Sequence, residues 1–181
     1  MTLFDDAFRD LILIEGGYSN DPKDRGGATM YGITEAVARA HGYAGPMDRL
    51  DLATAKSIYR RAYWDRQRLD EVEFRAGASI AVELFDTGVN MGVLVAGRFL
   101  QTALNALNRE GRDFPDMDVD GRIGPGTLFA LRAYVQARGQ EGRVVLLRAL
   151  NCLQGARYLQ IAASDPSQEA FVYGWIRARV A

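Results

Sequence analysis

The sequence predicts a mainly α fold with one small β element. Two observations predict it: apolar residues recur at helical spacing along most of the 181 residues, and capping residues or glycines bound these stretches. Only the segment ATMYGIT, residues 28–34, and the turn around Asp120-Gly121 have the character of β structure. A chain of this length can bury a core as one compact domain or as two small ones.

The first helix is expected over residues 3–15. One face of it carries three apolar residues and a carboxylate: Phe4, Phe8, Leu11 and Glu15. Thr2 and Asp5 have the spacing of a capping box, and Gly16 with Gly17 supplies the stop. The helix therefore delivers Glu15 to the apolar side of its last turn.

Further helices follow along the chain. Thr34 can cap a helix through EAVARAH that Gly42 ends, and Asp51 can cap one through LATAKSIYRRAYWD. Later helices are expected at about 77–90, 93–108, 126–138, 143–163 and 168–180. The polar segment 66–78 predicts a seam between two parts, residues 1–75 and 76–181, that are packed into one compact unit.

Composition excludes several classes of protein. With 22 basic and 23 acidic residues the net charge is −1, which argues against a nucleic-acid partner. The longest apolar stretch, residues 78–100, contains Glu83, Asp86 and Arg98, so no stable membrane insertion is expected. The N-terminus has aspartates where a Sec signal has positive charge, so we expect a soluble protein made in the cytoplasm. Cys152 is expected to pack in the core.

No metal or other cofactor is predicted. His41 is the single histidine and precedes Gly42, as a helix C-cap does, and no cysteine pair exists to hold zinc. The segment DMDVDGRIG, which starts at Asp116, resembles the start of a calcium loop. Thr127 stands where that loop needs a bidentate glutamate, so a turn at Asp120 is the better interpretation.

Glu15 is the candidate catalytic acid. Apolar neighbours, the negative end of the helix dipole and a nearby carboxylate would each raise its pKa, as a proton donor requires. Asp24 in the following loop is the candidate to orient or activate water, and Thr29 has a hydroxyl that can hold one. The alternative is that this loop is ordinary turn chemistry, with Asp24 capping it.

The motif EGGYSNDPKDRGGATMYGIT, residues 15–34, resembles the Glu-Gly-Gly-Tyr signature of glycoside hydrolase family 108, the N-acetylmuramidases once called secretion activator proteins. It also resembles the Glu-x8-Asp-x5-Thr pattern of phage-type lysozymes. The resemblance implies that Glu15 is the catalytic glutamate and Asp24 the phage-type aspartate. The threonine of that pattern falls on Met30, because Thr29 is one residue short. A lysozyme-like α+β fold, with the β element beside the active-site cleft, is also implied.

Later segments resemble the family's predicted peptidoglycan-binding domain. They are AYWDR, ELFDTGVNMG, FLQTALN, DVDGRIGPGTLFAL and GWIRARV. The resemblance implies a muramidase catalytic part in residues 1–75 and a helical peptidoglycan-binding part in residues 76–181. The implied partner is the glycan strand of peptidoglycan, approached by a monomer after export through a holin or a secretion system. A phage endolysin and a bacterial secretion-associated muramidase both fit.

Five residues are candidates for substrate binding. Tyr18 and Tyr31 flank the candidate site, where aromatic rings can pack on the C–H faces of sugars or simply pack in the fold. Gly26 and Gly27 let the backbone approach a ligand closely. Asn90 has an amide suited to an N-acetyl group. Two rival functions remain open: a catalytically silent peptidoglycan-binding or secretion-accessory protein, and a lytic transglycosylase.

Overall fold

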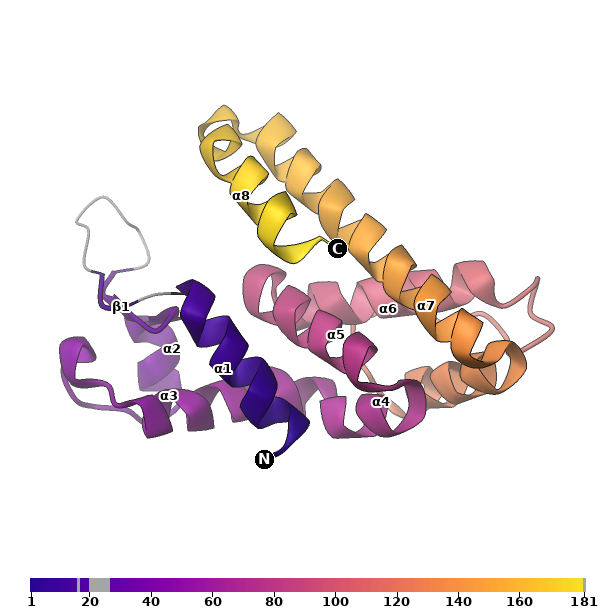
Figure 1. Ribbon diagram of the computed structural model, residues 1–181, viewed down its shortest axis with the longest axis horizontal. Coiled ribbons are helices and arrows are strands. Elements are labelled where there is room, and N and C mark those ends of the chain that lie inside the picture. Colours follow the sequence, from indigo (N-terminus) through magenta and orange to yellow (C-terminus); the bar gives the residue numbers. More distant parts are fainter. Residues whose placement is uncertain (16, 20–26, 181) are drawn as a thin grey trace. The chain divides into compact units, whose positions relative to one another are not determined.

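The computed structural model (Figure 1) describes residues 1–15, 17–19 and 27–180, with the side chains of residues 14 and 15 outside the description. The chain divides into two compact units, Met1–Arg66 and Gln67–Ala181. Most described residues are helical, and the two strands among them pair in one small hairpin. The predicted mainly α, lysozyme-like fold is thereby confirmed. Of the described helices, none is long and apolar enough to cross a membrane.

The first unit contains these elements: α1 (Leu3–Glu15), β1 (Thr29–Met30), β2 (Ile33–Thr34), α2 (Glu35–Ala40), η1 (Met47–Arg49), α3 (Leu52–Tyr59), the π-helical turn η2 (Arg60–Trp64) and η3 (Asp65–Gln67). Helix α1 has the predicted bounds. Its capping box forms as expected, since the Thr2 amide donates to the Asp5 carboxylate over 2.7 Å and the Asp5 amide to the Thr2 hydroxyl over 3.3 Å.

An aromatic cluster forms the core of this unit. Phe4 and Phe8 on the inner face of α1 meet the rings of Trp64 and Tyr59, with centroid distances of 5.3 and 5.6 Å. All four rings are buried. Edge-to-face and tilted pairs of this kind add to the free energy gained by burying apolar area. The apolar spacing of α1 therefore fixes the face that packs, and so the orientation of its C-terminal end.

The β hairpin turns at Tyr31 and Gly32. Strands β1 and β2 pair antiparallel, with Thr29 opposite Thr34 and Met30 opposite Ile33. Tyr31 and Gly32 both have positive φ, 52° and 73°, which a type I′ hairpin turn requires. Glycine adopts this backbone without cost, whereas a tyrosine is held in it by its surroundings. The predicted β element at residues 28–34 is confirmed.

The second unit is helical: α4 (Leu69–Ala76), α5 (Ala78–Met91), α6 (Val93–Leu107), α7 (Pro125–Ser164), η4 (Pro166–Gln168) and α8 (Glu169–Arg179). Gly77 and Gly92, both with φ of 95°, separate α4, α5 and α6. Element α7 consists of two helices that meet at Gly139, where φ is 61° and ψ is −145°, so the predicted division between residues 126–138 and 143–163 is confirmed. Helix α4 lies within the segment predicted as a polar seam.

Two further predictions have clear outcomes. His41 is the C-cap of α2, and its Nδ1 lies 3.0 Å from the Val37 carbonyl oxygen, as expected for this position. Cys152 is exposed, so the prediction that it packs in the core is wrong. Leu150, Asn151 and Gln154, which lie around it in α7, are buried.

Candidate functional site

Glu15 is the last residue of α1, which ends where the sequence predicted. The final turn of this helix, residues 12–15, is apolar up to Glu15 itself. The backbone carbonyls at a helix C-terminus carry the negative end of the helix dipole. The Glu15 side chain lies outside the described residues, as do Asp24 and Gly26.

A pair of backbone hydrogen bonds ties the segment after Glu15 to the hairpin. The Ser19 amide donates to the Thr29 carbonyl over 2.9 Å, and the Thr29 amide donates to the Ser19 carbonyl over 2.8 Å. These bonds join the two ends of the sequence that contains Asp24. Ser19 follows Glu15 by four residues, so their Cα atoms lie within about 14 Å of each other even if that chain is extended. The fold therefore brings Glu15, Ser19 and Thr29 into one region.

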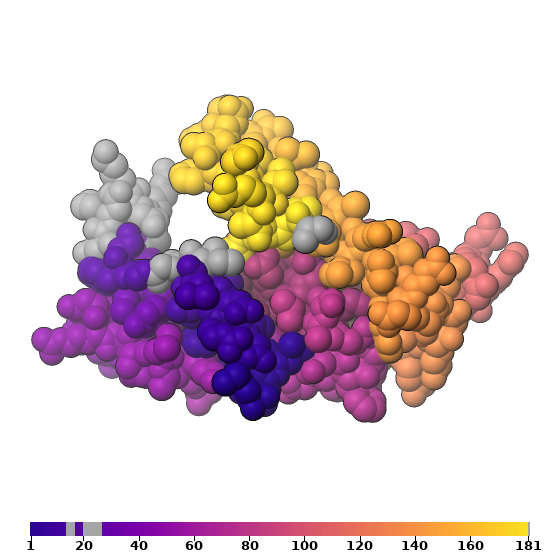
Figure 2. Space-filling model, viewed as in Figure 1, coloured from indigo at the N-terminus to yellow at the C-terminus, as the bar shows by residue number. Residues whose placement is uncertain are grey.

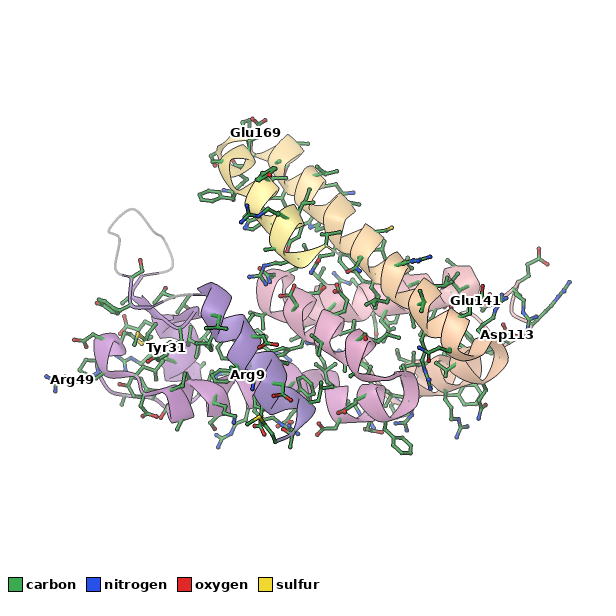
Figure 3. All side chains as sticks on the ribbon, viewed as in Figure 1. Arg9, Tyr31, Arg49, Asp113, Glu141 and Glu169 are labelled. Atoms are coloured by element: carbon green, nitrogen blue, oxygen red, sulfur yellow. The ribbon has the colours of Figure 1, made fainter. Side chains whose placement is uncertain are left out.

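The described candidates of this region are Tyr18, Gly27, Thr29 and Tyr31. Tyr18 is about half exposed, and Gly27, with φ of 71°, is exposed and has open space around the position of a Cβ. The Thr29 hydroxyl donates to the Gly27 carbonyl over 3.3 Å, which leaves its oxygen lone pairs able to accept from water. Tyr31, labelled in Figure 3, is partly buried.

The hairpin is anchored on both sides. The buried Tyr59 of α3 donates its hydroxyl to the Tyr31 carbonyl over 2.9 Å, which holds the left-handed turn. On the other side, the Glu35 amide donates to the Ala28 carbonyl over 2.9 Å, and the Thr34 hydroxyl accepts from the Val37 amide over 3.4 Å. The candidate residues therefore lie on a short hairpin that is fixed to α2 and α3.

Asn90 lies in the second unit, near the end of α5. Its Nδ2 donates to the Asp86 carbonyl over 3.1 Å and to the Asp86 carboxylate over 3.4 Å. The residue is exposed. Its proposed role with an N-acetyl group stays a prediction.

Asp86 is the centre of a buried polar network that the sequence did not reveal. Gln154 of α7 donates to Asp86 Oδ2 and to the Thr87 hydroxyl, each over 3.0 Å, and the buried Arg179 of α8 forms an ion pair with Asp86 Oδ1. Burial raises the pKa of Asp86, and the charge of Arg179 with the hydrogen bonds opposes that shift. The sequence marked only Asp86 itself, as a carboxylate inside an apolar helix, and none of its distant partners.

Glu83 lies one turn before Asp86 and is also buried. Burial raises the pKa of Glu83 to about 7, and the charge of Asp86 adds to this effect. The Thr87 hydroxyl donates to its Oε1 over 3.2 Å and opposes the shift. Glu83 therefore changes charge near neutral pH.

The segment that resembles a calcium loop, which starts at Asp116, is held by hydrogen bonds to Gln101 and Asn108. Asn108 donates to Asp116 Oδ1 over 2.6 Å, and Gln101 donates to Asp120 Oδ1 over 2.8 Å. The Gly121 amide in turn donates to Gln101 Oε1 over 2.7 Å. Among the residues that the structure describes, no cluster of three or more His, Cys, Asp or Glu could hold a metal ion.

Comparison with known families identifies the class of protein. Residues 8–92 match the family Glycosyl hydrolase 108, and residues 95–180 match the Predicted Peptidoglycan domain. Residues 8–92 therefore form a glycosyl hydrolase family 108 domain, and residues 95–180 form a peptidoglycan domain. Together the two matches define a glycosidase that acts on peptidoglycan of the cell wall.

One solved structure is similar to the chain over almost its whole length. The structure of Brucella abortus SagA is similar to this chain with a TM-score of 0.62 and 26% sequence identity, over 98% of this chain and 95% of that chain. The similarity thus includes both matched regions. No curated protein sequence matches the chain.

Proposed function

We propose that this protein is an N-acetylmuramidase that hydrolyses the β-1,4 bond between N-acetylmuramic acid and N-acetylglucosamine. Glu15 is the general acid that protonates the leaving oxygen, and Asp24 orients or activates water. The observation that carries the proposal is the position of Glu15 at the end of α1, inside the region that matches glycosyl hydrolase family 108. The negative end of the helix dipole favours the protonated carboxyl there.

The hairpin supplies the rest of the proposed site. The pairing of Ser19 with Thr29 supports a short connection between Glu15, the loop with Asp24 and the hairpin. Thr29 holds a water through its hydroxyl oxygen, while Tyr18 and Tyr31 pack on sugar rings and the backbone at Gly26 and Gly27 admits the glycan. The catalytic part in this proposal is residues 1–75, and residues 76–181 bind the wall.

Glu15→Gln tests the catalytic role. Mass spectrometry of the muropeptides released from purified sacculi should show reducing-end N-acetylmuramic acid with the wild type. The variant should release less by on the order of 100-fold or more, because it loses a positioned acid. Asp10→Asn is the matched control, since Asp10 is an exposed carboxylate on the same helix. It should keep wild-type activity.

The other outcomes identify the rivals. If the wild type binds sacculi and releases no glycan, the protein is a silent peptidoglycan-binding protein. If it releases anhydro sugars and Asp24→Asn keeps full activity, it is a lytic transglycosylase, which needs no water-activating partner. Activity retained by Glu15→Gln would refute the assignment of Glu15.

A further inference from the structure

A row of three aromatic rings runs from the surface to the interior of the second unit. Phe171 and Trp175 of α8 stack with a centroid distance of 5.9 Å and an angle of 21° between planes. Trp175 also contacts Tyr158 of α7, with centroids 5.2 Å apart. Figure 1 shows α8 running alongside the end of α7, and Glu169, labelled in Figure 3, marks the start of α8.

Exposure decreases along this row. Phe171 is 54% exposed, Trp175 is half-buried, and Tyr158 is 3% exposed. Phe171 and Trp175 are four residues apart, so they lie on one face of α8. The exposed ring of Phe171 therefore packs on Trp175, which in turn packs on the buried ring of Tyr158. Such a stack presents an aromatic surface at low conformational entropy cost.

The family match and the charge of this region favour a carbohydrate partner for the exposed ring. The row lies within residues 95–180, the part of the chain that matches a peptidoglycan domain. These residues contain eleven arginines and eight acidic residues, so they are net positive although the whole chain carries −1. Peptidoglycan offers apolar sugar faces for aromatic rings and carboxylates for a basic surface.

We propose that Phe171 and Trp175 form a stacking platform that holds a peptidoglycan glycan strand on α8. The outer ring packs on the C–H face of a pyranose, and Trp175 supports it from beneath. The surface of α8 is drawn in yellow in Figure 2. The platform shares its substrate class with the proposed muramidase function, but it binds the glycan and takes no part in bond cleavage.

Phe171→Ala tests the platform, with Tyr173→Ala as its matched control. Tyr173 is 76% exposed on the same helix, but its position between the two platform residues turns it to another face. The probe is a soluble peptidoglycan fragment free of cross-links, titrated into the full-length chain by calorimetry at low temperature. Loss of one stacking contact should weaken binding about 2- to 10-fold. Tyr173→Ala should bind as the wild type does.

A conservative variant separates stacking from folding. Phe171→Tyr keeps a flat ring and should retain wild-type affinity, whereas Phe171→Leu keeps apolar bulk and should bind as weakly as Phe171→Ala. Equal affinity in Phe171→Ala and the wild type would overturn the proposal. So would a Phe171→Ala variant that loses self-association in ultracentrifugation and keeps its affinity, since the platform would then contact a second copy.

Failure of the platform is distinguishable from failure of the muramidase proposal. Loss of glycan release in Glu15→Gln, with unchanged binding in Phe171→Ala, would retain the enzyme and refute the platform. Binding that depends on Phe171, in a wild-type protein that releases no glycan, would retain the platform and refute the muramidase assignment.

Discussion

Replacing Glu83 by Gln should stabilise the protein above neutral pH and leave its stability unchanged in acid. Glu83 is buried in α5, one turn from the carboxylate of Asp86. Burial, aided by that neighbour, raises the pKa of Glu83 from 4.5 to about 7. A glutamine amide has nearly the same shape, can still accept the hydrogen bond from Thr87 and never ionises.

The magnitude follows from the two pKa values. The folded protein binds the Glu83 proton more tightly than the unfolded chain does, so the stability this proton contributes is fully present below pH 4.5 and is lost as the pH rises through 7. A pKa difference of this size corresponds to about 3 kcal/mol in the free energy of unfolding. The advantage of Glu83→Gln should therefore be close to zero in acid and grow to at most about 3 kcal/mol above neutral pH.

Urea denaturation followed by circular dichroism measures this difference. Midpoints and slopes are compared for the wild type and Glu83→Gln below pH 4.5 and above pH 7, the two limits set by the pKa values. Glu141→Gln is the control, because Glu141 is an exposed carboxylate on α7 of the same unit. If the wild-type and Glu83→Gln stabilities run parallel across this pH range, the assignment of a costly buried charge to Glu83 is wrong.

Two substitutions test the packing. Tyr59→Phe removes the hydroxyl that holds the Tyr31 carbonyl, and it should cost about 1 kcal/mol and speed amide hydrogen exchange in the hairpin; unchanged exchange would show that the turn does not need this bond. Gly97→Ala would place a Cβ 2.0 Å from the Gly121 carbonyl oxygen and should lower stability by about 1–3 kcal/mol in thermal unfolding. Gly126→Ala, with open space around its Cβ, is the control, and equal effects of the two alanines would contradict this reasoning.

Local signals predicted most of the helices because their physical causes are local. The capping box of α1, the Thr34 cap of α2 and the Asp51 cap of α3 each form within four residues of chain. Helix α4 was missed because its sequence, LDEVEFRA, is half charged. Its buried residues, Leu69, Val72 and Ala76, still have helical spacing.

The buried face of α7 could not be predicted from the hydrophobicity of its residues, and the prediction for Cys152 was wrong for this reason. The row of buried residues there runs through Leu146, Leu150, Gln154 and Tyr158, each four residues from the next. Cys152 lies two residues from this row, which turns it to the opposite face of the helix. The polar Gln154 belongs to this row and is fully buried, because its amide donates to Asp86 and Thr87.

One part of the candidate site depends on a short stretch of sequence, and another part depends on contacts between distant residues. Glu15, Asp24 and Thr29 stand in one short motif, so the sequence alone could mark them as candidates. The pairing of Ser19 with Thr29, which joins the two ends of that motif's loop, was not predicted. The Asp86 network joins residues that are 68 and 93 positions apart in the chain, so no local pattern could show it. Only the packing of both α5 and α8 against α7 brings these groups together.

That packing makes the two family regions depend on each other. Helices α4 and α5 belong to the region that matches glycosyl hydrolase 108, yet they lie in the same compact unit as the peptidoglycan domain. Asp86 of the hydrolase region is neutralised by Arg179 of the peptidoglycan domain, and a buried carboxylate without such a partner would cost several kcal/mol. Asn90 donates to the same carboxylate. The last helix of the peptidoglycan domain therefore stabilises the end of α5, where a candidate substrate-binding residue lies.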